Sequence, residues 1–210
     1  MSSGPPIRRR RKDERPDEIV EAGFQAFAES GFHGTTLDDV AKRAGITKGT
    51  IYLYFDSKQA LFEAAVQSRS GPLLGEVEGL VNGWDSSMEA LLRLMIQTMH
   101  AAINSGELKH VFRIMIAEGE RFPELTKFHY ENFVSKFDAI LEQVLSRGIA
   151  TGEFRDTPVN RTPMLVMSPG LMTLIWRMTF HPYKNISPRE FLDGHLDLVL
   201  NGLRAGGQDA

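Results

Sequence analysis

The sequence predicts an all-α fold. Apolar residues recur at spacings of three and four along most of the 210-residue chain, which is the pattern of an amphipathic helix. Almost no window alternates apolar and polar residues, as a half-buried strand would. Glycine and proline interrupt the helical pattern at intervals. We therefore expect a series of helices joined by short turns.

The composition excludes several classes of protein. Hydrophobic residues make up 42% of the chain, which is enough to bury a core. The chain has no cysteine, which excludes disulfides and thiolate metal sites. No glycine-rich phosphate loop, nucleophile motif or helical histidine pair occurs, so we expect no catalytic residue, no metal and no cofactor.

The sequence also predicts a cytoplasmic protein. The basic N-terminus is not followed by an apolar segment, so it does not resemble a secretory signal. The longest apolar run, residues 164–180, is too short and too interrupted to span a membrane. We interpret it as a buried helix, and we expect no membrane partner.

Basic charge is concentrated at the front of the chain. The whole chain has a net charge of −3, but residues 8–15 hold six basic and two acidic side chains. We assign residues 1–12 to a flexible basic arm. By itself, such an arm is typical of a solvated tail.

The next segment, residues 13–73, predicts a small domain of short helices. The first helix begins after Arg15 and ends at Ser30-Gly31. Thr36 is placed to cap a helix of barely two turns. A glycine, Gly45, is placed to stop that helix.

A third short helix is expected to follow directly. Thr47 is placed to cap it, and we extend it through Phe55. Helices this short are stable only when packed against a neighbour. Together they predict a helix-turn-helix over about residues 36–55.

The exposed face of this third helix is expected to carry hydroxyl groups and one cation, without a carboxylate. Such groups donate to phosphate oxygens and reach base edges in the major groove, which predicts a DNA-facing surface. The residues are Thr47, Lys48, Thr50, Tyr52 and Tyr54. The two tyrosines are equally compatible with half-buried packing. Gly49 costs about 1 kcal/mol inside a helix, and it serves either a tight turn or close approach of DNA.

Residues 27–58 closely resemble the N-terminal domain of the tetracycline-repressor (TetR) family of bacterial regulators. The matching elements are the aromatic-x-x-Thr-Thr entry to the second helix, Val40-Ala41, Ala44-Gly45, Lys48-Gly49-Thr50 and the Tyr-x-Tyr-Phe-x-Ser-Lys run that ends at Lys58. The resemblance implies an N-terminal three-helix, helix-turn-helix DNA-binding domain over 13–73. It further implies a C-terminal helical ligand-binding and dimerisation domain over 74–210.

The resemblance also implies roles for single residues. Thr47, Lys48, Gly49 and Thr50 would enter the major groove of double-stranded operator DNA. Tyr52, Tyr54 and Lys58 would hold phosphates, and Thr36 would add a backbone contact. The basic arm would reach an adjacent minor groove or a flanking phosphate. A homodimer acting as a repressor is the norm of the family.

Longer helices are expected after the helix-turn-helix. A fourth helix would run from Asp56 or Ser57 to about Arg69, where Gly71-Pro72 would break it. Further helices are predicted at about 72–82, 86–104, 107–121, 124–147, 162–180 and 188–204. We expect the fourth helix to be the single covalent route between the two domains.

The C-terminal part carries flexible and aromatic side chains suited to an adaptable pocket for a small apolar or aromatic effector. These residues are Met95, Met99, Phe112, Met115, Phe133, Phe137 and Trp176. Each of them is equally compatible with the core. The run 111–125 resembles a subgroup that regulates multidrug efflux or membrane-lipid functions, which indicates no particular ligand.

The last two predicted helices carry more apolar surface than one helix pair hides. We expect a two-fold four-helix bundle to form the dimer interface. The interface residues that we select are Leu171, Ile175, Met178, Leu192, Leu196 and Val199. An internal core remains the alternative for about half of the apolar residues in these helices.

Overall fold

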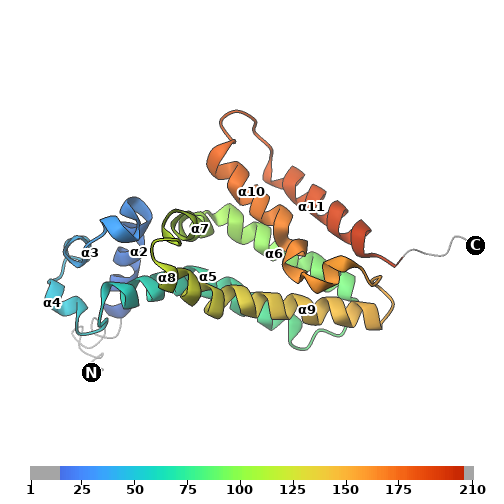
Figure 1. The fold of residues 1–210 in the computed structure, drawn as a ribbon, viewed down its shortest axis with the longest axis horizontal. Coiled ribbons are helices and arrows are strands. Elements are labelled where there is room, and N and C mark those ends of the chain that lie inside the picture. Colours follow the sequence, from blue (N-terminus) through green and yellow to red (C-terminus); the bar gives the residue numbers. More distant parts are fainter. Residues whose placement is uncertain (1–14, 206–210) are drawn as a thin grey trace, which may run out of the picture. The chain divides into compact units, whose positions relative to one another are not determined.

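The computed structural model describes residues 15–205, so the predicted basic arm over 1–12 lies outside the described residues. Between residues 15 and 205 every regular element is a helix, apart from an isolated antiparallel bridge between Phe154 and Arg204. Figure 1 shows this series of helices. The all-α prediction is confirmed.

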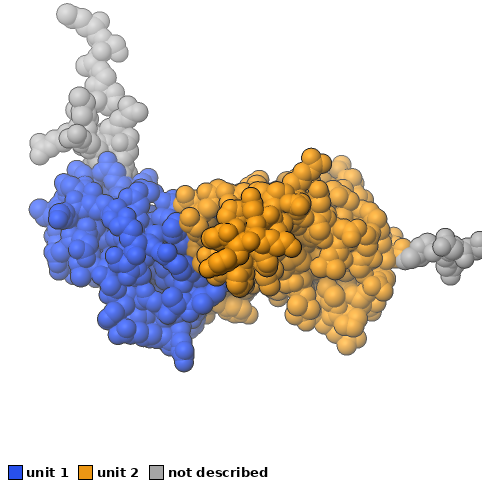
Figure 2. Space-filling model, turned by 90° about the horizontal axis from the view of Figure 1, so that it is seen from above, with its two compact units in different colours: residues 1–69, 110–129 blue, residues 70–109, 130–210 orange. Residues whose placement is uncertain are grey.

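The chain divides into two compact units, coloured separately in Figure 2. The N-terminal unit consists of the residues up to 69 together with 110–129, and the C-terminal unit of 70–109 together with the residues from 130 onward. The chain therefore passes between the units three times. The prediction of a single covalent route is wrong, because residues 110–129 return to the N-terminal unit.

Helices α2 (Arg15–Gly34), α3 (Leu37–Ala44) and α4 (Lys48–Ile51) form the first part of the N-terminal unit. Parts of α5 (Lys58–Val81) and α7 (Glu107–Glu118) join them, together with α8 (Pro123–His129). The core is rich in aromatic rings: Phe27 and Phe32 each lie 5.1 Å from Phe62, measured between ring centroids. Such edge-on ring pairs add to the free energy of burial.

Local capping explains why the short helices form. Thr36 and Asp39 make a reciprocal capping box at the start of α3, with the Thr36 N–H donating to the Asp39 carboxylate at 2.9 Å. Gly45 ends α3 in the left-handed conformation, at a φ of 66°, which a side chain would disfavour. Both predicted caps, Thr36 and Thr47, are confirmed.

Two predicted helix ends are wrong. Helix α4 stops at Ile51, not at Phe55, because the N–H groups of Leu53 and Tyr54 donate to carbonyls only three residues earlier, at 3.3 and 2.9 Å, which does not continue the i→i−4 pattern of an α-helix. The side chains of Tyr54 and Phe55 pack against the core. Helix α5 continues through Pro72 to Val81. The exposed Pro72 removes one helical hydrogen bond, whereas the buried Leu73, Leu74 and Val77 stabilise the helix beyond it.

The C-terminal unit is built around α6 (Met88–Ser105), which packs against α9 (Ser135–Ala150), α10 (Ser168–Thr179) and α11 (Pro188–Leu203). A π-helical turn, Tyr130–Val134, leads into α9. Two 3₁₀ turns, Pro158–Arg161 and Pro163–Met167, precede α10. The predicted helices at 124–147 and 162–180 are thus each divided.

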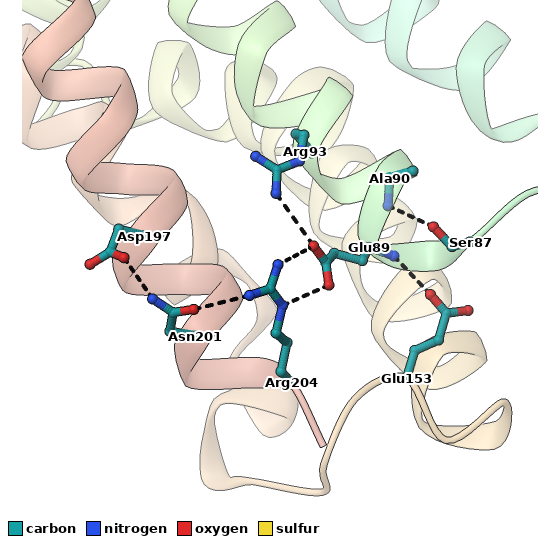
Figure 3. A network of polar contacts seen from close by, with 8 residues as sticks. All are labelled: Ser87, Glu89, Ala90, Arg93, Glu153, Asp197, Asn201 and Arg204. Carbon is teal, nitrogen blue, oxygen red and sulfur yellow. Dashed lines mark hydrogen bonds and ion pairs between the residues drawn. The ribbon is translucent and has the colours of Figure 1, made fainter. Parts of the chain in front are cut away.

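A polar network joins the start of α6 to Arg204 at the end of α11 and to Glu153 (Figure 3). The Glu89 carboxylate accepts hydrogen bonds from Arg204, at 2.8 and 2.6 Å, and from Arg93 at 3.3 Å. The Glu89 N–H donates to Glu153 at 3.1 Å. The hydrogen bond from Arg204 is the main reason why the pKa of Glu89 is lowered. Because exposed ion pairs contribute only about 0.2–1 kcal/mol, the network chiefly sets the register of α11 on α6.

Candidate nucleic-acid interface

The surface of α4 presents the side chains that the sequence selects. Thr47, Lys48 and Gly49 are exposed and Thr50 is half-exposed, while the fully buried Ile51 anchors the helix. The Thr47 hydroxyl accepts the Thr50 N–H at 3.3 Å and lies 2.9 Å from the Thr50 hydroxyl. These contacts fix both hydroxyl groups on a short, rigid turn.

The face of α4 has a carboxylate beside it that the sequence did not indicate. Asp38, which lies on α3, accepts a hydrogen bond from Lys48 Nζ at 2.7 Å. This hydrogen bond raises the pKa of Lys48. Both side chains are exposed, and exposed pairs of this kind are weak. A phosphate group can therefore replace Asp38 as the partner of Lys48 at small cost.

Gly49 has no structural need to be glycine within the chain. Its φ is not in the left-handed region. The nearest atom to a Cβ placed there would be Thr47 Oγ1, at 3.8 Å. The tight-turn interpretation therefore loses its basis, whereas close approach of DNA stays a prediction.

The two tyrosines differ in their surroundings. Tyr52 is exposed, whereas Tyr54 is half-buried and packs against the aromatic core. Tyr52 thus offers its hydroxyl freely to a partner. For Tyr54, the packing role that the sequence left open is observed, and a phosphate contact stays a prediction.

Lys58 and Thr36 both have structural partners. Lys58 Nζ donates to the carbonyl oxygens of Phe32 and Thr35, at 2.9 and 3.0 Å, and lies 4.4 Å from the centroid of the Phe32 ring. An ammonium group has three donors, and these two carbonyl oxygens take up two of them. Thr36 is engaged in the cap of α3. The DNA contacts of both residues stay predictions.

The predicted pocket residues are divided between the two units. Phe112 and Met115 lie in the N-terminal unit, where Met115 packs against the core. The other five lie in the C-terminal unit: Met95, Met99, Phe133, Phe137 and Trp176. Of these, Met95, Met99 and Phe137 are buried, and Phe133 stacks on Phe137 with ring centroids 5.8 Å apart. Trp176 donates to the Lys184 carbonyl at 2.9 Å.

A buried histidine pair lies in the C-terminal unit. His100 Nε2 is 3.0 Å from His195 Nδ1, and His195 Nε2 is 2.8 Å from the Val166 carbonyl oxygen. Because a carbonyl only accepts, His195 Nε2 carries the proton and His100 donates to His195. Burial, followed by the neighbouring His195, lowers the pKa of His100 to about 4. The pair is therefore neutral near pH 7.

The predicted dimer residues fall into three groups. Leu171 and Met178 are exposed, Ile175 and Leu192 are half-buried, and Leu196 and Val199 are buried within the single chain. Residues 164–180 are thus only partly buried, against our prediction. Two further apolar residues on these helices, Met172 and Leu198, are exposed as well and lie outside the selected set. Their exposure depends on which faces of α10 and α11 pack on α6, which helical spacing alone does not specify.

Two further classes of site can be checked over residues 15–205. Among these residues, no group of three or more His, Cys, Asp or Glu is arranged to hold a metal ion. None of the helices in the same range is both long enough and apolar enough to cross a membrane.

Two family descriptions match the chain. Residues 19–65 match "Bacterial regulatory proteins, tetR family". Residues 89–196 match "AefR-like transcriptional repressor, C-terminal domain". The first match contains α3 and α4, and the second begins at the second residue of α6, runs through α10 and ends within α11.

Curated relatives match over much of the chain. The HTH-type transcriptional repressor KstR2 of Rhodococcus jostii is 28% identical over 201 residues, covering 91% of this chain and 92% of that protein. The fatty acid metabolism regulator protein of Bacillus subtilis is 27% identical over 148 residues, covering 69% of this chain and 74% of that protein.

Solved structures share the fold. FadR of Bacillus subtilis in complex with stearoyl-CoA superposes with a TM-score of 0.74 at 22% identity, over 89% of this chain and 98% of that one. The ketosteroid transcriptional regulator KstR2 of Mycobacterium tuberculosis superposes with a TM-score of 0.66 at 24% identity, over 91% of this chain and 96% of that one.

Proposed function

The chain belongs to the tetR family of bacterial regulatory proteins, and on that premise we propose how it recognises and releases DNA. It is a sequence-specific DNA-binding transcriptional repressor. In our proposal, two copies of α4 read an operator, and a small apolar or aromatic effector releases the protein from it. The cytoplasm, where bacterial operators lie, is the proposed location.

The arrangement of α4 is the single observation that carries the DNA-binding role. Thr47, Lys48 and Gly49 are exposed together on a helix that the buried Ile51 fixes to the core. The hydroxyl groups and the ammonium are donors for phosphate and base edges. Gly49 lets the DNA backbone or a base edge approach the helix closely. Lys48 exchanges Asp38 for a DNA acceptor when the complex forms.

Dimerisation is proposed to use α10 and α11. Leu171, Met172, Met178 and Leu198 are exposed apolar side chains on these two helices. A two-fold contact would bury them and would present two copies of α4 to two half-sites. We include Ile175 and Leu192, which are half-buried, at the edge of the contact. Leu196 and Val199 would support it from within the fold.

The C-terminal unit is the proposed effector site. Its five pocket candidates are apolar or aromatic, and methionine side chains adapt to different ligand shapes. The relatives point in the same direction, because one was solved with stearoyl-CoA and another is described as a ketosteroid regulator. The stearoyl chain and a steroid skeleton are both apolar, so an effector with an apolar part that enters the pocket fits both.

The test is a titration of stearoyl-CoA into free protein and into the protein–DNA complex. The DNA is a duplex that the wild-type chain selects from a randomised pool, and coenzyme A without an acyl chain is the control. Linkage requires that an effector which weakens DNA binding binds the complex more weakly by the same factor, typically about 5–150-fold. Equal affinities for free and DNA-bound protein would contradict the release mechanism.

A further inference from the structure

The segment 110–129 lies far along the chain from α4 but forms part of the same compact unit. Its buried side chains Val111, Ile114 and Leu125 belong to the core that also contains Val40 of α3 and Ile51 of α4. The helix-turn-helix therefore shares one core with the end of α7 and with α8. Any specific contact between these elements bears directly on how the helix-turn-helix is held.

The most specific of these contacts is made by Glu118, the last residue of α7. Its carboxylate Oε2 accepts a hydrogen bond from the His33 backbone N–H at 2.7 Å. Hydrogen bonds from a backbone N–H to a carboxylate are stronger than those between neutral groups. Glu118 is half-buried, although the hydrogen bond itself is exposed to solvent.

The position of Glu118 on its own helix does not explain why a glutamate stands there. A carboxylate at the C-terminal end of a helix faces the negative end of the helix dipole, which is unfavourable. The sequence places a glutamate there nevertheless. The compensating interaction is the one with His33, 85 residues earlier in the chain.

Gly31 makes room for this carboxylate. It has a φ of 73°, and a Cβ on it would overlap Glu118 Oε1. The backbone therefore bends at Gly31 in a conformation that favours glycine, and Glu118 occupies the space beside it. The ring of Phe122 adds a second contact, with its centroid 5.0 Å from that of Phe32.

The loop held in this way leads into the DNA-facing helices. We give the name α2–α3 loop to residues 31–36, which are the end of α2 from its kink at Gly31 onward together with the two residues that follow; this segment ends at Thr36, the cap of α3. Lys58 binds the carbonyl oxygens of Phe32 and Thr35 in the same loop. Lys58 thus donates to two carbonyl oxygens of this loop, and Glu118 accepts from one of its N–H groups. Helix α3, which follows the loop, carries Asp38, the partner of Lys48.

We propose that Glu118 is a positioning residue for DNA recognition, which holds the α2–α3 loop and, through it, α3 and α4 in the geometry that reads the operator. This role rests on the DNA-binding function. The end of α7 is then as much a part of the DNA-reading unit as the helix-turn-helix itself, and Glu118 acts without touching DNA.

The experiment compares Glu118→Ala with Glu120→Ala in the full chain. Both substitutions remove one negative charge, and Glu120 is exposed two residues further on. Affinity is measured by fluorescence anisotropy in about 0.15 M salt, for a duplex that the wild-type chain selects from a randomised pool and for a scrambled duplex. Hydrogen exchange of the His33 amide is followed in parallel.

Charge alone predicts that both variants bind DNA at least as tightly as the wild type, since each loses a carboxylate that repels phosphate. We expect the opposite for Glu118→Ala: about tenfold weaker binding of the selected duplex, little change for the scrambled one, and faster exchange at His33. Glu120→Ala should show neither effect. Glu118→Gln, which keeps an acceptor oxygen, should recover most of the affinity.

Equal binding of the selected duplex by Glu118→Ala and Glu120→Ala would overturn the proposal. If Glu118→Ala is unfolded by circular dichroism, the charge-neutral pair Glu118→Asp and Glu120→Asp decides in its place, because only the shorter side chain at 118 loses its reach to His33. Failure of the wild type to enrich any duplex would contradict DNA recognition itself, and this role with it.

Discussion

The N-terminal unit exposes polar groups on short capped helices, whereas the C-terminal unit buries a polar pair and exposes apolar side chains. Thr47 and Lys48 face solvent on α4, while His100 and His195 are buried among the helices of the C-terminal unit. Leu171 and Leu198 are exposed in that same unit. The polar surface suits a charged polymer, and the exposed apolar surface suits a second copy of the chain.

The prediction with the largest expected effect tests whether residues 110–129 belong to the N-terminal unit. Leu125 is 1% exposed and belongs to the core of that unit. We expect Leu125→Ala to lower the free energy of unfolding by about 2–5 kcal/mol. Hydrogen exchange should show lost protection in α2 to α4. Ile116→Ala, at a 66% exposed position, is the control and should change stability by less than about 0.5 kcal/mol. Lost protection confined to α9 to α11 would contradict the assignment of Leu125 to the N-terminal unit.

The second prediction separates the dimer surface from the core of the C-terminal unit. Leu198 is 66% exposed and Leu196 only 9%. We expect Leu198→Glu to give a folded monomer with about hundredfold weaker operator binding, because the specific contacts of one half-site are lost. Leu196→Glu should instead lower the melting temperature, since it buries a charge. Sedimentation at micromolar concentration checks both. A wild type that sediments as a monomer would contradict the proposed interface.

The third prediction concerns the buried histidine pair. Burial lowers the pKa of His100 to about 4, below the ordinary value of about 6.5. The unfolded chain therefore takes up a proton at a higher pH than the folded protein does. The free energy of unfolding should fall by about 1–3 kcal/mol as the pH drops from about 6.5 to 4, with no contribution from this group above that window. Urea unfolding at several pH values should give a flatter profile for His100→Gln than for the wild type; identical profiles would refute this assignment.

The smallest expected effect sharpens the role of Gly49. Alanine fits at this position without a clash, so Gly49→Ala should raise stability by up to about 1 kcal/mol through helix propensity. The same change should weaken operator binding, because the methyl group would keep DNA away. Gly75→Ala in α5, also without a clash, should stabilise without affecting DNA binding. Thermal melting and anisotropy measure the two effects, and unchanged DNA affinity of Gly49→Ala would remove the argument for close approach.

Local features of the sequence predict the helix-turn-helix well, because they act within a few residues. Thr36 and Thr47 cap their helices, and Gly45 ends α3 as its freedom at positive φ allows. The helical character of the whole chain follows from apolar spacing. These are the features that a single sequence carries in its own neighbourhood.

Long-range contacts account for what the sequence does not predict. The partner of Lys48 is ten residues away on another helix, and the partner of Glu118 is 85 residues away. The continuation of α5 through Pro72 depends on the burial of the residues that follow it. Which face of α11 is buried depends on the position of α6, so Leu196 and Leu198 could not be told apart.

The central claim is that two copies of α4 read a two-fold operator. Its most direct test is to sequence the duplexes that the wild-type chain enriches from a randomised pool. The account predicts an inverted repeat whose half-site centres are about 10 base pairs, or a multiple of that, apart. Enrichment of this repeat should be lost when Lys48 is changed to alanine. Enrichment of a single unpaired half-site, or of no sequence at all, would contradict it.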